Sequence, residues 1–257
     1  MKENMSSQRT IGIVGGVGPS ASLYTMQKVF DNTKTVHDQD HLPVILISKP
    51  NMIEDRSKYL LSLSGCNPGY SILSIIMQLE EAGADIVGIP CNTAHSEKIM
   101  SVIREGLKER NSKVLLVNLI DEVIQYITSN WPERKNVGIL TTIGMYYDGE
   151  YLKKLEKNGL KGIMLCEESQ NCLLNDSIYN PTCGIKALGV MVPDQVRKNI
   201  ESCIEELISY GAQIIVLACT ELPLIIREKY YREIPILDSA DILARALVRE
   251  ADRDKLK

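Results

Sequence analysis

Residues 79–93 read LEEAGADIVGIPCNT, and residues 207–220 read LISYGAQIIVLACT. In each copy a helix end, a Gly-Ala turn and an apolar run precede a cysteine, which follows the glycine by eight residues. The openings of the two regions match as well, because IGIVG at 11–15 parallels VGILT at 137–141. This repeat predicts two duplicated α/β halves, each with a cysteine at the carboxyl end of a strand.

Short apolar runs alternate with longer helical patterns along the whole chain. Apolar residues recur at three- and four-residue steps over 72–82 and 196–210, which is typical of amphipathic helices. Strand–helix alternation predicts parallel sheets with helices on their faces. The apolar runs expected to form strands are 11–14, 44–47, 86–89, 114–117, 137–140, 162–165, 214–218 and 234–237.

Eight such strands would also suit a closed (β/α)8 barrel, but the repeat favours two separate halves. We therefore predict an α/β fold of two pseudo-symmetric Rossmann-like domains. Each is expected to be a mainly parallel four-stranded sheet flanked by helices, with an active site in the cleft between them. The expected domains are residues 1–118 with Cys91 and residues 119–237 with Cys219, and a C-terminal helix within 238–257 is able to pack on the first.

The composition of the 257 residues is that of a globular protein, with 44% hydrophobic and 24% charged residues. A net charge of -4 argues against a nucleic-acid or anionic-membrane partner. No apolar run approaches the length of about 20 residues that spans a bilayer. Residues 1–9 are polar and lack the apolar segment of a signal peptide, so we expect a cytoplasmic protein.

The seven cysteines are odd in number and irregularly spaced, which is a poor disulfide framework and favours free thiols in a reducing compartment. Cys91 and His95 are close enough in sequence to share a metal, but the other two histidines lie far upstream. Because a structural zinc site needs four ligands, we expect no metal.

Cys91 and Cys219 are placed where ligands bind in open α/β sheets, outside the carboxyl ends of strands. Thr93 and Thr220 fit helix N-caps, and a helix N-terminus favours the thiolate form of a nearby cysteine. Two such loops that face each other would put one thiol on each side of a small molecule. One thiolate could then remove a proton from carbon while the opposite thiol delivers one. The remaining cysteines have no repeat partner and are expected to be structural: Cys66, Cys166, Cys172, Cys183 and Cys203.

The glycine-rich segment 15–21 also follows a predicted strand and resembles a dinucleotide fingerprint. The next predicted strand ends in Ser48-Lys49, however, and not in the acidic residue expected on a ribose. We interpret Gly16 and Gly18 as positions whose missing side chains let backbone amides approach a small anionic ligand. A tight turn without a ligand is the alternative.

Six motifs together resemble the aspartate/glutamate racemase superfamily, in its aspartate racemase branch. In chain order they are GGVGP at 15–19, DQDH at 38–41, DRS at 55–57, PCNTAH at 90–95, Ile178-Tyr179 with Gly184-Ile-Lys186, and ACTE at 218–221. Glutamate racemases are similar but carry Asp-Ser-Gly-x-Gly-Gly and Cys-Thr-His at the first and last of these places. The resemblance implies racemisation of aspartate without a cofactor, and leaves glutamate or a broader amino-acid range open.

The resemblance also implies roles for individual residues. Cys91 and Cys219 correspond to the two catalytic thiols, with Cys91 expected on the D face and Cys219 on the L face of the substrate. Arg56 and Lys186 correspond to the cations that hold substrate carboxylates, although the segment from Tyr179 to Lys186 is longer than in the shortest relatives. The other expected site residues are Asn92, Thr93, Thr141, Thr142 and Thr220, and the roles of His95 and Glu221 stay open.

Two other functions remain open on these residues. The first is a maleate-type isomerase or a decarboxylase, in which one cysteine is the nucleophile or the sole proton donor. The second is a catalytically silent protein that binds an acidic amino acid. The resemblance further implies a homodimer, with a small acidic amino acid as its partner molecule.

Overall fold

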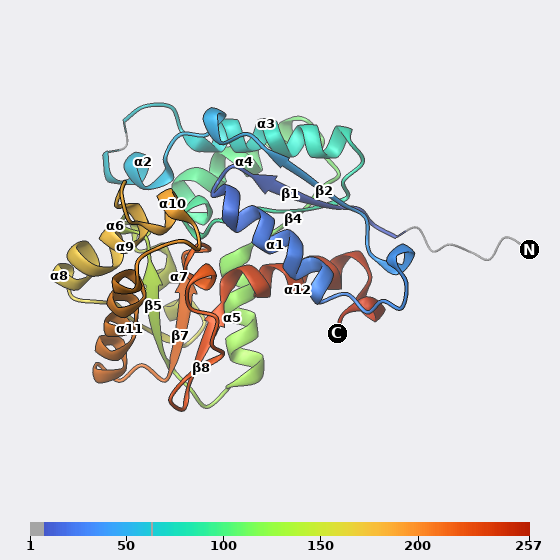
Figure 1. Cartoon of the computed structure of the whole chain (residues 1–257). Helices are drawn as coiled ribbons and strands as arrows, with labels where there is room; N and C mark the ends of the chain where they lie inside the picture. The colour runs from blue at the N-terminus through green and yellow to red at the C-terminus, as the bar shows by residue number, and fades with distance from the viewer. Residues whose placement is uncertain (1–7, 63) are drawn as a thin grey trace, which may run out of the picture.

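The computed structural model describes residues 8–62 and 64–257 and contains two sheets (Figure 1). The prediction about the polar residues 1–9 concerns residues 1–7 as well, and these lie outside the described part. The first sheet is wholly parallel and has the order β2-β1-β3-β4. Its strands are β1 (Ile11–Gly15), β2 (Val44–Ser48), β3 (Ile86–Gly88) and β4 (Leu115–Val117).

The second sheet repeats this order as β6-β5-β7-β9, which confirms the duplicated α/β fold. Its strands are β5 (Asn136–Thr141), β6 (Lys161–Ile163), β7 (Ile214–Ala218), β8 (Tyr230–Tyr231) and β9 (Ile234–Asp238). The short β8 pairs antiparallel with β9 and makes this sheet five-stranded, where the sequence predicts four strands. Two residues are too few to show the alternation by which a strand is recognised in a sequence.

Helices cover both faces of each sheet. The predicted helices at 72–82 and 196–210 correspond to α3 and α11. The helices are α1 (Pro19–Asp31), α2 (Arg56–Ser62), α3 (Pro68–Glu81), α4 (Glu97–Glu109), α5 (Leu119–Asn130), α6 (Ile143–Asp148), α7 (Glu150–Lys157), α8 (Glu167–Ser169), α9 (Asp176–Tyr179), α10 (Ile185–Leu188), α11 (Asp194–Ser209) and α12 (Ser239–Ala251).

The two halves share a central hydrophobic core. Ile11 and Ile13 of β1 and Val137 and Ile139 of β5 all point into it, because alternate residues of a strand face the same side. Helices α1, α5 and α12 complete this core, and Figure 1 shows α1 and α12 side by side between the sheets. The opposite faces of the sheets pack on α3 and on α11 in two outer cores. A shared core fixes how the strand ends of one half face those of the other.

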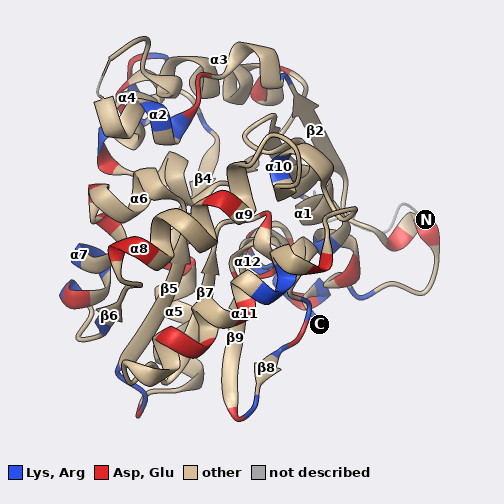
Figure 2. Cartoon of the chain, turned by 60° about the vertical axis from the view of Figure 1, so that its left-hand side comes forward, with Lys and Arg blue, Asp and Glu red and all other residues tan. Residues whose placement is uncertain are grey.

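Acidic and basic residues lie next to each other on α7, whereas the charged residues of α8 are acidic, as Figure 2 shows. None of the helices within the described ranges is long and apolar enough to cross a membrane.

Candidate active site

The carboxyl ends of β3 and β7 bring the two predicted cysteines to one small cavity. Cys219 directly follows β7, and Cys91 lies three residues after the end of β3. The cavity has a volume of about 10 Å³. Its lining residues are Arg56, Cys91, Asn92, Thr93, Thr142, Tyr179, Lys186, Cys219, Thr220 and Glu221. Since this volume holds about one water molecule, the site is closed and must open to admit an amino acid.

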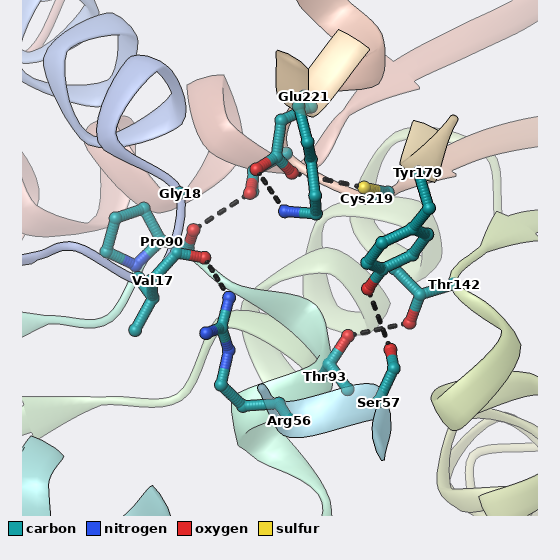
Figure 3. Close-up of polar contacts among 12 residues, drawn as sticks. Val17, Gly18, Arg56, Ser57, Pro90, Thr93, Thr142, Tyr179, Cys219 and Glu221 are labelled. Atoms are coloured by element: carbon teal, nitrogen blue, oxygen red, sulfur yellow. Dashed lines mark hydrogen bonds and ion pairs between the residues drawn. The ribbon is translucent and has the colours of Figure 1, made fainter. Parts of the chain in front are cut away.

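Three hydrogen bonds close the site by joining the two halves. Thr93 Oγ1 lies 2.8 Å from Thr142 Oγ1, and Thr220 Oγ1 donates to the Pro90 carbonyl oxygen at 2.8 Å. The third joins the Ser57 and Tyr179 hydroxyl oxygens at 2.8 Å (Figure 3). Each partner lies near a strand end or on a short helix after one, so opening the site requires these bonds to break.

The threonines that follow the cysteines do not cap helices, which corrects the expectation from sequence. Thr93 lies inside a 3-10 helix, Asn92–His95, whose N-cap is Cys91. Thr220 precedes a short 3-10 helix, Leu222–Leu224, whose N-cap is Glu221. Because the helix after each cysteine is only three or four residues long, the threonine hydroxyls are free to bond across the halves.

Cys219 is buried next to an acidic group. Its Sγ donates to Glu221 Oε2 at 3.2 Å, while Lys186 Nζ lies 2.6 Å from Glu221 Oε1. Burial and the Glu221 charge raise the pKa of Cys219 well above its ordinary value. The expectation that a helix N-terminus lowers the pKa of this thiol is therefore wrong for Cys219. The adjacent ammonium of Lys186 overcomes burial and lowers the pKa of Glu221, so Glu221 is a carboxylate.

Lys186 reaches the site in spite of its longer approach segment. Its side chain is 24% exposed, and its ammonium lies 5.4 Å from the centre of the Tyr179 ring. Burial alone would lower the pKa of Lys186, but Glu221 and Cys219 raise it above its ordinary value. Lys186 is therefore an ammonium paired with a carboxylate of the protein itself.

Arg56 is the cation on the Cys91 side of the cavity. Its Nη2 donates to the Val17 carbonyl oxygen at 2.6 Å, and Nη1 donates to Glu54 O at 3.4 Å. Its Nε is buried and has no hydrogen-bond partner among the residues that the structure describes. Burial acts to lower the pKa of Arg56, but Cys91 and Asp55 outweigh it and raise that pKa. With two of its five N–H donors bonded, Arg56 has capacity for further acceptors.

Asn92 lines the cavity but uses its amide to hold other residues. Its Nδ2 donates to Ser239 Oγ at 3.0 Å, and its Oδ1 accepts from the Tyr151 hydroxyl at 3.3 Å. Ser239 Oγ in turn donates to Leu217 O, next to the end of β7. Asn92 thus links the first half to the second, and one amide proton is left for a ligand.

His95 is 1% exposed and lies outside the residues that line the cavity. Its Nδ1 donates to the Cys91 carbonyl oxygen at 2.9 Å. Burial lowers the pKa of His95 to about 4, so the ring is neutral near pH 7. The geometry favours a role in fixing the Cys91 backbone.

Three predicted site residues lie outside the cavity lining. Thr141 is the last residue of β5, and its hydroxyl donates to Ala218 O within the sheet. At Gly16 a Cβ would lie 2.7 Å from Pro50 N, and at Gly18 it would lie 2.3 Å from Glu221 Oε1. The glycines therefore allow close approach of other parts of the protein, and the anion next to Gly18 is the Glu221 side chain.

Tyr179 and Glu221 line the cavity although the sequence did not assign them a place there. Both belong to the quoted motifs, and Glu221 directly follows the Cys-Thr pair, which was the available signal. The five cysteines without a repeat partner lie outside the lining, and all seven cysteines are free. Among residues 8–62 and 64–257, no three His, Cys, Asp or Glu side chains cluster so as to hold a metal ion.

Comparisons with known proteins place this site in context. Residues 14–247 match the model of the family described as Asp/Glu/Hydantoin racemase. The chain is 28% identical over 243 residues to the broad specificity amino-acid racemase RacX of Bacillus subtilis (strain 168), covering 93% of this chain and 96% of that protein.

Two solved structures are similar over nearly the whole chain. The aspartate racemase of Picrophilus torridus has a TM-score of 0.75 at 28% identity, covering 95% of this chain and 94% of that one. An aspartate racemase homologue from Pyrococcus horikoshii OT3 has a TM-score of 0.68 at 25% identity, covering 95% and 99% of the two chains.

Proposed function

The chain belongs to the Asp/Glu/hydantoin racemase family, and from this premise we propose that it interconverts L- and D-aspartate with Cys91 and Cys219 as the two acid/base groups. One observation carries the proposal. The two cysteines, one from each duplicated half, line the same closed cavity together with Arg56 and Lys186. A thiol on each side of Cα and cations for carboxylates are the parts that such a reaction needs.

The proposed reaction moves one proton out of the substrate and one in. The thiolate of one cysteine takes the Cα proton and becomes a thiol, and the thiol of the other gives its proton to the opposite face and becomes a thiolate. The enzyme then returns to its starting form by exchanging a proton with water. Arg56 and the threonine hydroxyls would stabilise the negative charge that develops on the substrate carboxylate in the transition state.

Aspartate is proposed because two cationic side chains in the cavity keep donors for a ligand carboxylate: Arg56 has unused N–H groups, and Lys186 has two ammonium protons besides the one that Glu221 accepts. The relatives favour different ranges, since one is called an aspartate racemase and another a broad specificity amino-acid racemase. Chiral separation of the products from a panel of L- and D-amino acids will define the range. Aspartate turnover far below that of neutral amino acids would overturn the aspartate part of the proposal.

Replacement of each cysteine tests the two-thiol mechanism. Cys91→Ala and Cys219→Ala should each abolish racemisation, and solvent deuterium should appear at Cα of the product of the wild-type enzyme. Cys172→Ala is the matched control, because Cys172 is exposed and outside the cavity lining. Near-normal turnover by either cavity variant would refute the mechanism. Loss of carbon dioxide from the substrate, or a stable adduct on one cysteine, would indicate different chemistry.

We also propose a cytoplasmic homodimer. Seven free cysteines suit a reducing compartment, and the dimer is what the family resemblance implies. Light scattering during size-exclusion chromatography measures the subunit number, and a monomer at working concentration would contradict the dimer.

A further inference from the structure

The two cysteines of the cavity face side chains of opposite charge. Cys219 Sγ is in contact with the Glu221 carboxylate at 3.2 Å. Cys91 lines the same cavity with the Arg56 guanidinium and is among the groups that raise the pKa of Arg56. The duplication thus places equivalent thiols in unequal surroundings.

We infer that Glu221 is a positioning residue that keeps the proton on Cys219 in the free enzyme, so that Cys219 is the thiol of the pair before substrate binds. This inference rests on the proposed two-thiol function and concerns the protonation state of the enzyme before substrate binds. It concerns the distribution of one proton between two thiols, and it needs no further reactant.

The Glu221 carboxylate is held in place on both oxygens. Oε1 is 2.6 Å from Lys186 Nζ, and Oε2 accepts the hydrogen bond from Cys219. Only 5% of Glu221 is exposed, and the Gly18 backbone packs against Oε1. The carboxylate therefore cannot turn away into solvent when Cys219 loses its proton, and a thiolate there would face a fixed negative charge.

The other charged and titratable groups around Cys219 do not cancel this effect. Lys186 is the nearest cation, but its ammonium is paired with Glu221. The Tyr179 hydroxyl is bonded to Ser57 and stays neutral, because burial raises the pKa of Tyr179. Arg56 is tied to the Val17 carbonyl on the Cys91 side. Burial and the Glu221 charge both raise the pKa of Cys219, in agreement with the contact geometry.

The inference has a kinetic consequence for the two enantiomers. L- and D-aspartate have equal free energies in water, so kcat/KM must be equal in the two directions. If the two free-enzyme forms have unequal populations, KM and kcat therefore differ between the two enantiomers while their ratio does not. The enantiomer that binds the form with a protonated Cys219 should have the lower KM, because that form predominates.

The test measures each thiol in the full-length enzyme without substrate. The rate of alkylation by iodoacetamide is followed against pH, and mass spectrometry of peptides separates Cys91 from Cys219. The pH midpoint of the rate reports the thiolate and is independent of how slowly the reagent enters. We expect the midpoint of Cys219 to lie at least about one pH unit above the ordinary value of a cysteine thiol, about 8.5, because a single adjacent charge produces a shift of this size.

Glu221→Gln is nearly isosteric and should lower the Cys219 midpoint by about one pH unit or more, with a smaller change at Cys91. Glu221→Asp keeps the charge and should keep the midpoint high. If Glu221→Gln fails to fold, Glu221→Ala removes the same charge and gives a second test, with the Cys219 midpoint again expected to fall. A lower midpoint at Cys219 than at Cys91, or a Cys219 midpoint unchanged in a folded Glu221→Gln enzyme, would overturn the inference.

Racemisation by the same preparations separates this inference from the proposed function. Racemisation of aspartate together with the wrong order of midpoints would support the proposed function and contradict this inference. The expected midpoints without racemisation would contradict the proposed function alone.

Discussion

Gly18→Ala tests whether the glycine loop exists to admit the Glu221 carboxylate. A Cβ at residue 18 would lie 2.3 Å from Glu221 Oε1 and 3.2 Å from Glu221 Cδ. To reach ordinary van der Waals distance between this Cβ and Glu221 Oε1, the carboxylate would have to move by about 1 Å. That movement would displace the group that contacts both Lys186 and Cys219. Because a misplacement of about 1 Å can cost about 100-fold in rate, we expect kcat/KM to fall by about that factor.

The substitution should also lower stability by a predictable amount. The backbone of Gly18 has φ of 150°, which side chains rarely adopt, and such a residue costs about 1–3 kcal/mol. For a chain of this size each kcal/mol lowers the melting temperature by about 2–4 °C. The variant should therefore still be folded at 25 °C, so its activity can be measured by chiral separation of the products.

Gly159→Ala is the matched control. Gly159 also has a positive φ, 71°, but a Cβ there would have no described atom within 4 Å. It should lose about 1 kcal/mol of stability and retain full activity. Wild-type kcat/KM in a folded Gly18→Ala enzyme would refute the reasoning. An equal loss of activity in Gly159→Ala would show that positive φ, and not the contact with Glu221, is responsible.

Three further predictions concern the closed cavity and its neighbours. Tyr179→Phe removes the hydrogen bond to Ser57 that must break before the site opens, so opening should become easier by about 1 kcal/mol and KM should fall by up to about fivefold. Adding Ser57→Ala should give no further change in KM in steady-state assays. Arg56→Lys replaces a planar fork by a point charge and should raise KM at least about tenfold; an unchanged KM would remove Arg56 from substrate binding. The third concerns His95, whose pKa is lowered by burial to about 4. Below about pH 6.5 His95 binds a proton in the unfolded chain but not in the folded one. The free energy of unfolding of the wild type should therefore fall by about 3 kcal/mol relative to that of His95→Gln between pH 6.5 and 4. Burial raises the pKa of Asp238 to about 6, so protonation of Asp238 increases the free energy of unfolding of both proteins as the pH falls. The quantity to measure is therefore the difference between the unfolding free energies of the two proteins in urea. A difference that does not change with pH would contradict the prediction.

The sequence determined the parts of this protein that depend on local pattern. The repeated strand ends around Cys91 and Cys219 predicted the duplication, because a buried strand and the turn before it have a fixed length and composition. The four parallel strands have the same order in both sheets. The sequence did not show β8, whose two residues carry no periodic signal. It also assigned helix caps to threonines whose hydroxyls bond across the halves.

Only the tertiary structure decided the chemistry around each cysteine. Sequence position alone predicted a lowered pKa for both thiols, yet burial and the Glu221 charge raise the pKa of Cys219. The contacts of Glu221 with Lys186 and with the loop at Gly18 join segments far apart in the chain. Their distances depend on how two halves pack around a shared core, and electrostatic energies depend on those distances and on burial. Local pattern therefore locates the two thiols, while packing sets which of them holds the proton.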